Sequence, residues 1–76
     1  MTRVMIKLQT IEQIKSLVQI ASACPYDIDI ASGRYVIDSK SILGIFSLDI
    51  TKPMELIIHG ENCEEILAQF EQFIVK

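Results

Sequence analysis

Hydrophobic residues follow two different periods along this chain, and the changes between them mark its elements. Near the N-terminus Val4, Ile6 and Leu8 alternate with other residues, which predicts a strand. From Thr10 to Cys24 the period becomes helical, because apolar residues recur every three or four positions until Pro25 ends the segment. The apolar stripe of this helix consists of Ile11, Ile14, Leu17, Val18 and Ala21.

The remaining elements are shorter. Residues 27–30 alternate as in a half-buried strand, Ser32-Gly33 is a two-residue hairpin signal, and residues 34–38 form the returning strand. A short helix follows from Ser41 through Leu48, then a loop at 49–53 and a strand at 54–59. The last helix starts at Asn62. Its stripe consists of Cys63, Ile66, Leu67, Phe70 and Phe73, and we expect these residues in the core.

The predicted order is therefore βαββαβα, within a single domain at residues 1–76. Right-handed crossovers place the fourth strand between the first two, so the predicted fold is α+β, a two-layer open-faced sandwich with an antiparallel four-stranded sheet in the order 1-4-2-3. The helices cover one face of the sheet, and the other face is expected to be open to water. That open face would carry Met5, Lys7, Asp27, Asp29 and Glu55.

Composition excludes several classes of function. The net charge of -3 and the absence of a basic cluster argue against nucleic acid as a partner. No apolar run approaches the roughly 20 residues of a membrane span. Cys24 and Cys63 occupy apolar helical positions, which favours reduced, buried thiols in a cytoplasmic protein. With one histidine and two distant cysteines, we expect no metal site, and no sequence motif indicates a cofactor.

The stretch from Ser32 to Leu48, and above all Lys40-Ser41-Ile42-Leu43-Gly44 followed by Ser47-Leu48, resembles the histidine-containing phosphocarrier (HPr) family of the bacterial sugar phosphotransferase system. Residues 60–65 resemble the start of the last helix in that family. The resemblance implies the same βαββαβα open sandwich and the same strand order.

The chain differs from the family at the positions that take part in phosphoryl transfer. The phospho-accepting histidine and the neighbouring arginine of the family fall on Thr10 and Glu12 here. A threonine is not a comparable nucleophile, and a glutamate inverts the charge that would stabilise the transferred group. We therefore expect no catalytic residues and no enzyme activity. His59 lies at the opposite end of the sheet and is expected to be a surface histidine.

Ser41 is the predicted regulatory phosphorylation site. The resemblance implies it, because the matching serine of some members is phosphorylated by a dedicated HPr kinase and then recruits a transcription regulator. Independently, Ser41 is an ordinary helix cap, and the two roles are compatible. Next to it, the short helix carries more apolar residues than one face can bury, which predicts a docking patch. The predicted partner-binding residues are Lys40, Ile42, Leu43 and Phe46. Gly44 is expected to face the first helix.

These observations predict a non-catalytic regulatory or adaptor protein with protein partners, among them an HPr kinase or a transcription regulator, and a monomer or weak dimer. Two alternatives remain open: a phosphocarrier that uses a non-standard site, and a diverged interaction module with an unrelated role.

Overall fold

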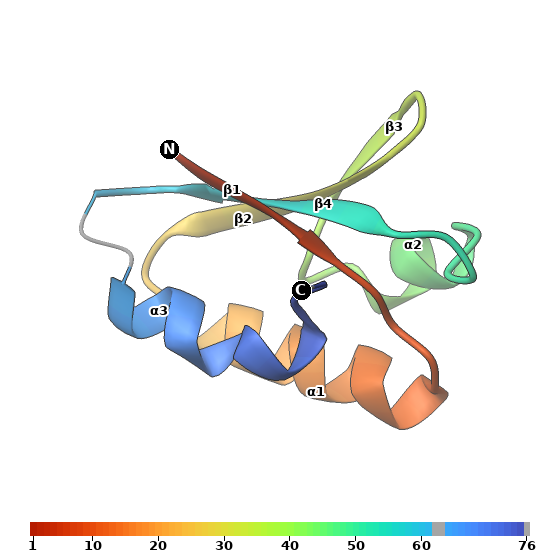
Figure 1. Cartoon of the computed structure of the whole chain (residues 1–76), viewed down its shortest axis with the longest axis horizontal. Coiled ribbons are helices and arrows are strands. Elements are labelled where there is room, and N and C mark those ends of the chain that lie inside the picture. The colour runs from red at the N-terminus through yellow and green to blue at the C-terminus, as the bar shows by residue number, and fades with distance from the viewer. Residues whose placement is uncertain (62–63, 76) are drawn as a thin grey trace.

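The structure is a computed structural model that describes residues 1–61 and 64–75. The cap predicted at Asn62 and the buried thiol predicted at Cys63 lie outside this part of the chain. The elements, drawn in Figure 1, are β1 (Thr2–Ile6), α1 (Ile11–Ala23), β2 (Asp27–Ser32), β3 (Tyr35–Asp38), α2 (Ile42–Phe46), β4 (Met54–His59), α3 (Glu64–Gln69) and a 3₁₀ helix, η1 (Glu71–Phe73).

The four strands form one antiparallel sheet in the order β1-β4-β2-β3. The helices α1 and α3 lie side by side beneath it, so the molecule has one helical layer and one sheet layer (Figure 1). This arrangement confirms the predicted fold class and strand order. The long central strand β4 pairs with β1 on one side and with β2 on the other.

The core lies between the two layers and is built from the inward residues that each period predicts. On α1 the side chains of Ile14, Leu17 and Ala21 are fully buried. Phe70 and Phe73 are also buried, with ring centroids 6.5 Å apart, which confirms the predicted aromatic core. They do not share one continuous helix, however, because α3 ends at Gln69 and η1 follows.

The C-terminal segment continues past η1 along the free side of β1. The backbone N–H of Lys7 donates to the carbonyl of Phe73 at 2.8 Å, and that of Val75 donates to Met5 at 2.9 Å. These bonds cover part of an edge strand that would otherwise expose unpaired groups. The opposite edge of the sheet, β3, has no such cover within residues 1–61 and 64–75.

Three local expectations need correction. Ile11 is 58% exposed although it was placed in the apolar stripe, because it occupies the first helical position at the margin of that stripe. Cys24 is only half-buried, since it follows the end of α1 rather than lying on its inner face. The second helix ends at Phe46, before Leu48.

The hairpin turn also differs by one residue from the prediction. The strand β2 runs through Ser32, and the two turn residues are Gly33 and Arg34. Gly33 has a φ of +60°, a conformation that glycine adopts without steric strain. Both dipeptides contain the glycine, so the pattern alone did not distinguish them.

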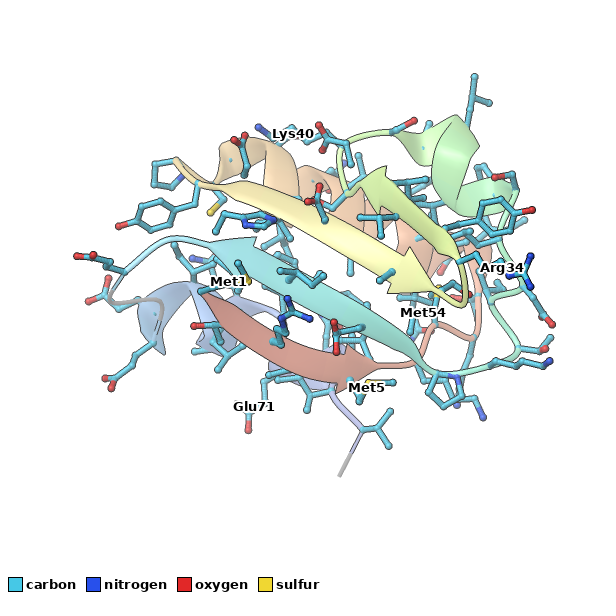
Figure 2. The ribbon with its side chains drawn as sticks, turned by 90° about the horizontal axis from the view of Figure 1, so that it is seen from above. Met1, Met5, Arg34, Lys40, Met54 and Glu71 are labelled. Atoms are coloured by element: carbon cyan, nitrogen blue, oxygen red, sulfur yellow. The ribbon has the colours of Figure 1, made fainter. Side chains whose placement is uncertain are left out.

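The face of the sheet away from the helices is open, and Figure 2 looks onto it. Met5 is exposed there, and Arg3 forms an ion pair with Glu55 across the β1–β4 pair at 3.2 Å. Asp27 is exposed, whereas Asp29 and Glu55 are half-buried among their neighbours. Charged side chains therefore occupy much of this face, as the alternation predicted.

Candidate functional site

Ser41 lies at the start of α2, between the end of β3 and the helix. It is the N-cap residue, with extended backbone angles, and its Oγ accepts a hydrogen bond from the N–H of Gly44 at 3.3 Å. The residue is exposed to solvent. The predicted capping role is therefore confirmed, on a residue that is exposed to solvent.

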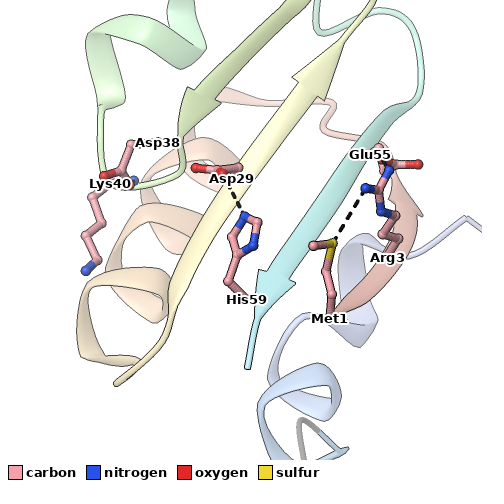
Figure 3. Close-up of polar contacts among 7 residues, drawn as sticks. All are labelled: Met1, Arg3, Asp29, Asp38, Lys40, Glu55 and His59. Carbon is pink, nitrogen blue, oxygen red and sulfur yellow. Dashed lines mark hydrogen bonds and ion pairs between the residues drawn. The ribbon is translucent and has the colours of Figure 1, made fainter. Parts of the chain in front are cut away.

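The turn that leads into Ser41 is held by the side chain of Asp38. Its carboxylate accepts the N–H of Lys40 at 2.9 Å, and its carbonyl accepts the N–H of Ser41 at 3.0 Å. The ammonium group of Lys40 points away from Asp38 (Figure 3). No ion pair involves Lys40 within residues 1–61 and 64–75, so this cation is available next to Ser41.

Gly44 faces Ser41 rather than the first helix, contrary to the expectation. A Cβ at this position would lie 3.0 Å from Ser41 Oγ and 3.4 Å from Ile37 Cδ1. Such a contact is tight for a carbon atom and would crowd the capping hydroxyl. The absence of a side chain at Gly44 thus leaves room for Ser41 Oγ over the first turn of α2.

The apolar residues of α2 divide between the core and the surface. Ile45 is fully buried, whereas Leu43 is 80% exposed and Phe46 is 44% exposed. Ile42 is half-buried against the core, so it contributes only part of its side chain to the surface. We call Leu43 and Phe46 the α2 patch. Together with Lys40 and Ser41, it places two apolar side chains, a cation and a hydroxyl on one exposed segment.

The start of α1 has a different character. Thr10 Oγ1 accepts the N–H of Gln13 at 3.1 Å. In return, the Gln13 side chain accepts the N–H groups of Thr10 at 3.3 Å and Gln9 at 2.6 Å. This is the predicted capping box, completed by one further bond. Glu12 adds a negative charge to the first turn, which suits the helix dipole but not the stabilisation of a transferred phosphoryl group.

His59 ends β4 and has a partner that sequence reasoning missed. Its Nε2 lies 2.8 Å from Asp29 Oδ2, with both side chains about one-third exposed at 38% and 32% (Figure 3). The two residues lie 30 positions apart and meet because β2 and β4 are antiparallel neighbours. Only the register of that strand pair, which the local pattern does not contain, would have revealed the contact.

The same geometry weighs against His59 as a phosphoryl acceptor. Arg3 is the nearest arginine on the adjoining strand, and its guanidinium bonds Glu55 and the sulfur of Met1 instead (Figure 3). Among the described residues, no group of three or more histidine, cysteine or acidic side chains is arranged to hold a metal ion. No described helix is long and apolar enough to cross a membrane.

Comparison with known proteins places this geometry in a family. A family model described as the PTS HPr component phosphorylation site matches residues 12–76, so the matched region begins after Thr10. No curated protein matches the chain.

Several solved structures share the fold. HPr-C-His from Thermoanaerobacter tengcongensis aligns with a TM-score of 0.80 and 25% identity, over 97% of this chain and 91% of that one. The phosphocarrier protein HPr from Bacillus anthracis aligns with a TM-score of 0.74 and 28% identity, over 97% of this chain and 94% of that one. The catabolite repression protein Crh of Bacillus subtilis aligns with a TM-score of 0.65 and 23% identity, over 100% of this chain and 93% of that one. That protein is described as a swapped, intertwined dimer. With the family model covering most of its length, the chain belongs to the HPr family of the phosphotransferase system.

Proposed function

We propose that this chain is a regulatory or adaptor member of the HPr family that does not relay phosphoryl groups through α1. The observation that carries the proposal is the contrast between the two helix starts. By the resemblance, the histidine and arginine positions of the family fall on Thr10 and Glu12, whereas Ser41 is exposed beside the α2 patch. The protein would act in the cytoplasm by binding protein partners, without a cofactor, as a monomer or weak dimer.

Phosphorylation of Ser41 is the proposed control. A phosphoryl group there would add about two negative charges next to Leu43 and Phe46. The charge would favour partners with arginine-rich surfaces and disfavour purely apolar ones. An HPr kinase is the proposed modifying enzyme, and a transcription regulator is one proposed partner of the modified form.

The test compares two phosphoryl donors on the same protein. With phosphoenolpyruvate and the general enzyme I of the phosphotransferase system, we expect no radiolabel on this chain while an authentic HPr control is labelled. With ATP and an HPr kinase, we expect acid-stable label that is lost in Ser41→Ala. Failure of the kinase to label the wild type, with an HPr control labelled, would favour the diverged interaction module.

One contact of the structure favours testing the alternative function, a phosphocarrier that uses a non-standard site. The Asp29 carboxylate bonds His59, and a carboxylate in that position can orient an imidazole for nucleophilic attack. His59→Ala distinguishes the two functions. Acid-labile label from phosphoenolpyruvate that disappears in this variant would establish His59 as the carrier residue and overturn the proposal.

A further inference from the structure

A second surface feature lies at the tip of the β2–β3 hairpin, away from Ser41. Residues 32–35 of the hairpin, together with residues 47–49 and Lys52 of the connection between α2 and β4, line a cavity of about 370 Å³ that is partly open to solvent. Figure 2 labels Arg34 at the hairpin tip beside this connection. The volume falls within the range of small-molecule sites, which is about 300–1,000 Å³.

Two cations, Arg34 and Lys52, line this cavity. Neither Arg34 nor Lys52 forms an ion pair within residues 1–61 and 64–75. The one acidic residue of the lining, Asp49, accepts the hydroxyl and the backbone N–H of Thr51 and offsets one of the two positive charges. The lining is therefore net positive on a chain whose net charge is -3.

The rest of the lining includes an aromatic and an aliphatic side chain, Tyr35 and Leu48, next to these charges. Tyr35 is 69% exposed and follows Arg34 directly, while Leu48 lines the opposite segment. The positive φ of Gly33 makes the tight turn that brings Arg34 and Tyr35 to the same cavity. A planar guanidinium, an ammonium group and an aromatic ring thus converge on one small volume.

We propose that this cavity binds a small phosphate ester that carries a ring. A guanidinium matches two phosphate oxygens with parallel N–H bonds, and an ammonium group adds a point charge, so together they suit a dianion. The ring of the ester would pack on Tyr35, where aromatic side chains provide contact area at low entropic cost. The site is separate from Ser41 and does not depend on the function proposed above.

Phenyl phosphate is the minimal probe, because it combines a ring with a phosphate and nothing else. In ¹H–¹⁵N NMR titrations at low salt, we expect saturable shifts confined to residues 33–35 and 47–52. Inorganic phosphate should bind the same residues more weakly, and phenol should produce no saturable shift.

Three variants test the assignment of the groups. Arg34→Gln should weaken phenyl phosphate binding by about tenfold, the effect of losing a charged hydrogen-bonding partner. Tyr35→Leu should weaken phenyl phosphate but leave inorganic phosphate unchanged. Lys15→Gln is the matched control, since Lys15 is an exposed cation on α1 outside the cavity, and should change neither.

Several results would overturn the proposal. These are shifts scattered over all lysines, equal losses in Arg34→Gln and Lys15→Gln, or no saturation at millimolar phenyl phosphate. Equal affinity for phenol and phenyl phosphate would likewise refute a phosphate site. Arg34 and Lys52 are exposed, so we expect the variants to fold, and Lys52→Gln provides a second measurement with the same expected direction.

Discussion

The helices α1 and α2 both begin at a hydroxyl-bearing residue, yet the two starts are built differently. At α1 the Thr10 hydroxyl and the Gln13 side chain satisfy three backbone N–H groups between them. At α2 the Ser41 hydroxyl accepts one bond, and Asp38 supports the preceding turn. At the first start the side chains bond the free N–H groups, whereas the second has an exposed serine next to Lys40, which forms no ion pair with any residue that the structure describes.

The two helices also differ in how firmly they are packed against the core, and α1 is again the better anchored one. The helix α1 has 13 residues and buries three of them completely, whereas α2 has five residues and buries only Ile45. A short helix gains little from its own hydrogen bonds and depends on tertiary packing. The exposed start of α2 therefore depends on one buried anchor, Ile45, whereas α1 is held at three positions.

The largest expected effect comes from removing that anchor. Ile45→Ala should lower the free energy of unfolding by about 3 kcal/mol, because it truncates a fully buried side chain and leaves a cavity. Urea denaturation monitored by circular dichroism measures the change. The control is Leu43→Ala in the same helix, where the 80% exposed side chain should give a change within about 0.5 kcal/mol. Similar losses in both variants would contradict the division between anchor and patch.

The second effect sharpens the comparison of the helix starts themselves. Thr10→Ala should destabilise the protein by about 1 kcal/mol, since it breaks the capping box of the longer helix. Ser41→Ala should have a smaller effect, because its cap bond at 3.3 Å is longer and α2 is shorter. Thermal melts at constant pH compare the two. The reverse order would mean that the start of α2 is the better stabilised one.

The third prediction concerns the exposed side of α2. Phe46→Ser should change the free energy of unfolding by no more than about 1 kcal/mol, because the ring is 44% exposed. The same substitution should abolish binding to a partner that uses the α2 patch, since aromatic residues dominate interface energies. Isothermal titration with a candidate HPr kinase or regulator tests the binding. A loss above about 3 kcal/mol would show that Phe46 belongs to the core.

The smallest effect lies at the other end of α2, in the connection to β4. The pKa of Asp49 is lowered from its usual 3.8, first by the hydrogen bond from the Thr51 hydroxyl and then by that from the Thr51 backbone N–H; desolvation acts in the opposite direction, and Lys52 adds the smallest lowering effect. A carboxyl group whose pKa is lower in the folded than in the unfolded chain contributes stability at pH values above the unfolded pKa. This contribution is lost as the pH falls through the folded pKa.

Denaturation midpoints between about pH 6 and about pH 2 should therefore show a slightly steeper acid loss for the wild type than for Asp49→Asn. Thr51→Val serves as the control, since it removes the hydroxyl that is the largest cause of the lowered pKa of Asp49. Its loss of stability in acid should be less steep than that of the wild type. Equal acid dependence in wild type and Asp49→Asn would rule out a contribution from this carboxylate.

Much of the fold was predictable because it depends on short-range patterns and on chain handedness. The inward residues of α1, the capping box at Thr10 and the cap at Ser41 each involve residues within about one helical turn. The strand order β1-β4-β2-β3 followed from right-handed crossovers between elements of known type. The assignment of the family's histidine and arginine positions to Thr10 and Glu12 likewise rests on the sequence alone, and it stays a prediction.

Contacts between residues that are distant in the sequence were decided only by the tertiary structure. The contact between His59 and Asp29 depends on the register of β2 against β4, and the cavity beside Arg34 depends on where the hairpin lies relative to the α2–β4 connection. The partial burial of Ile42 and the exposure of Ile11 depend on where the neighbouring layer ends. Local periodicity states which face of an element is apolar, but only the packed chain determines how far the opposite layer extends over it.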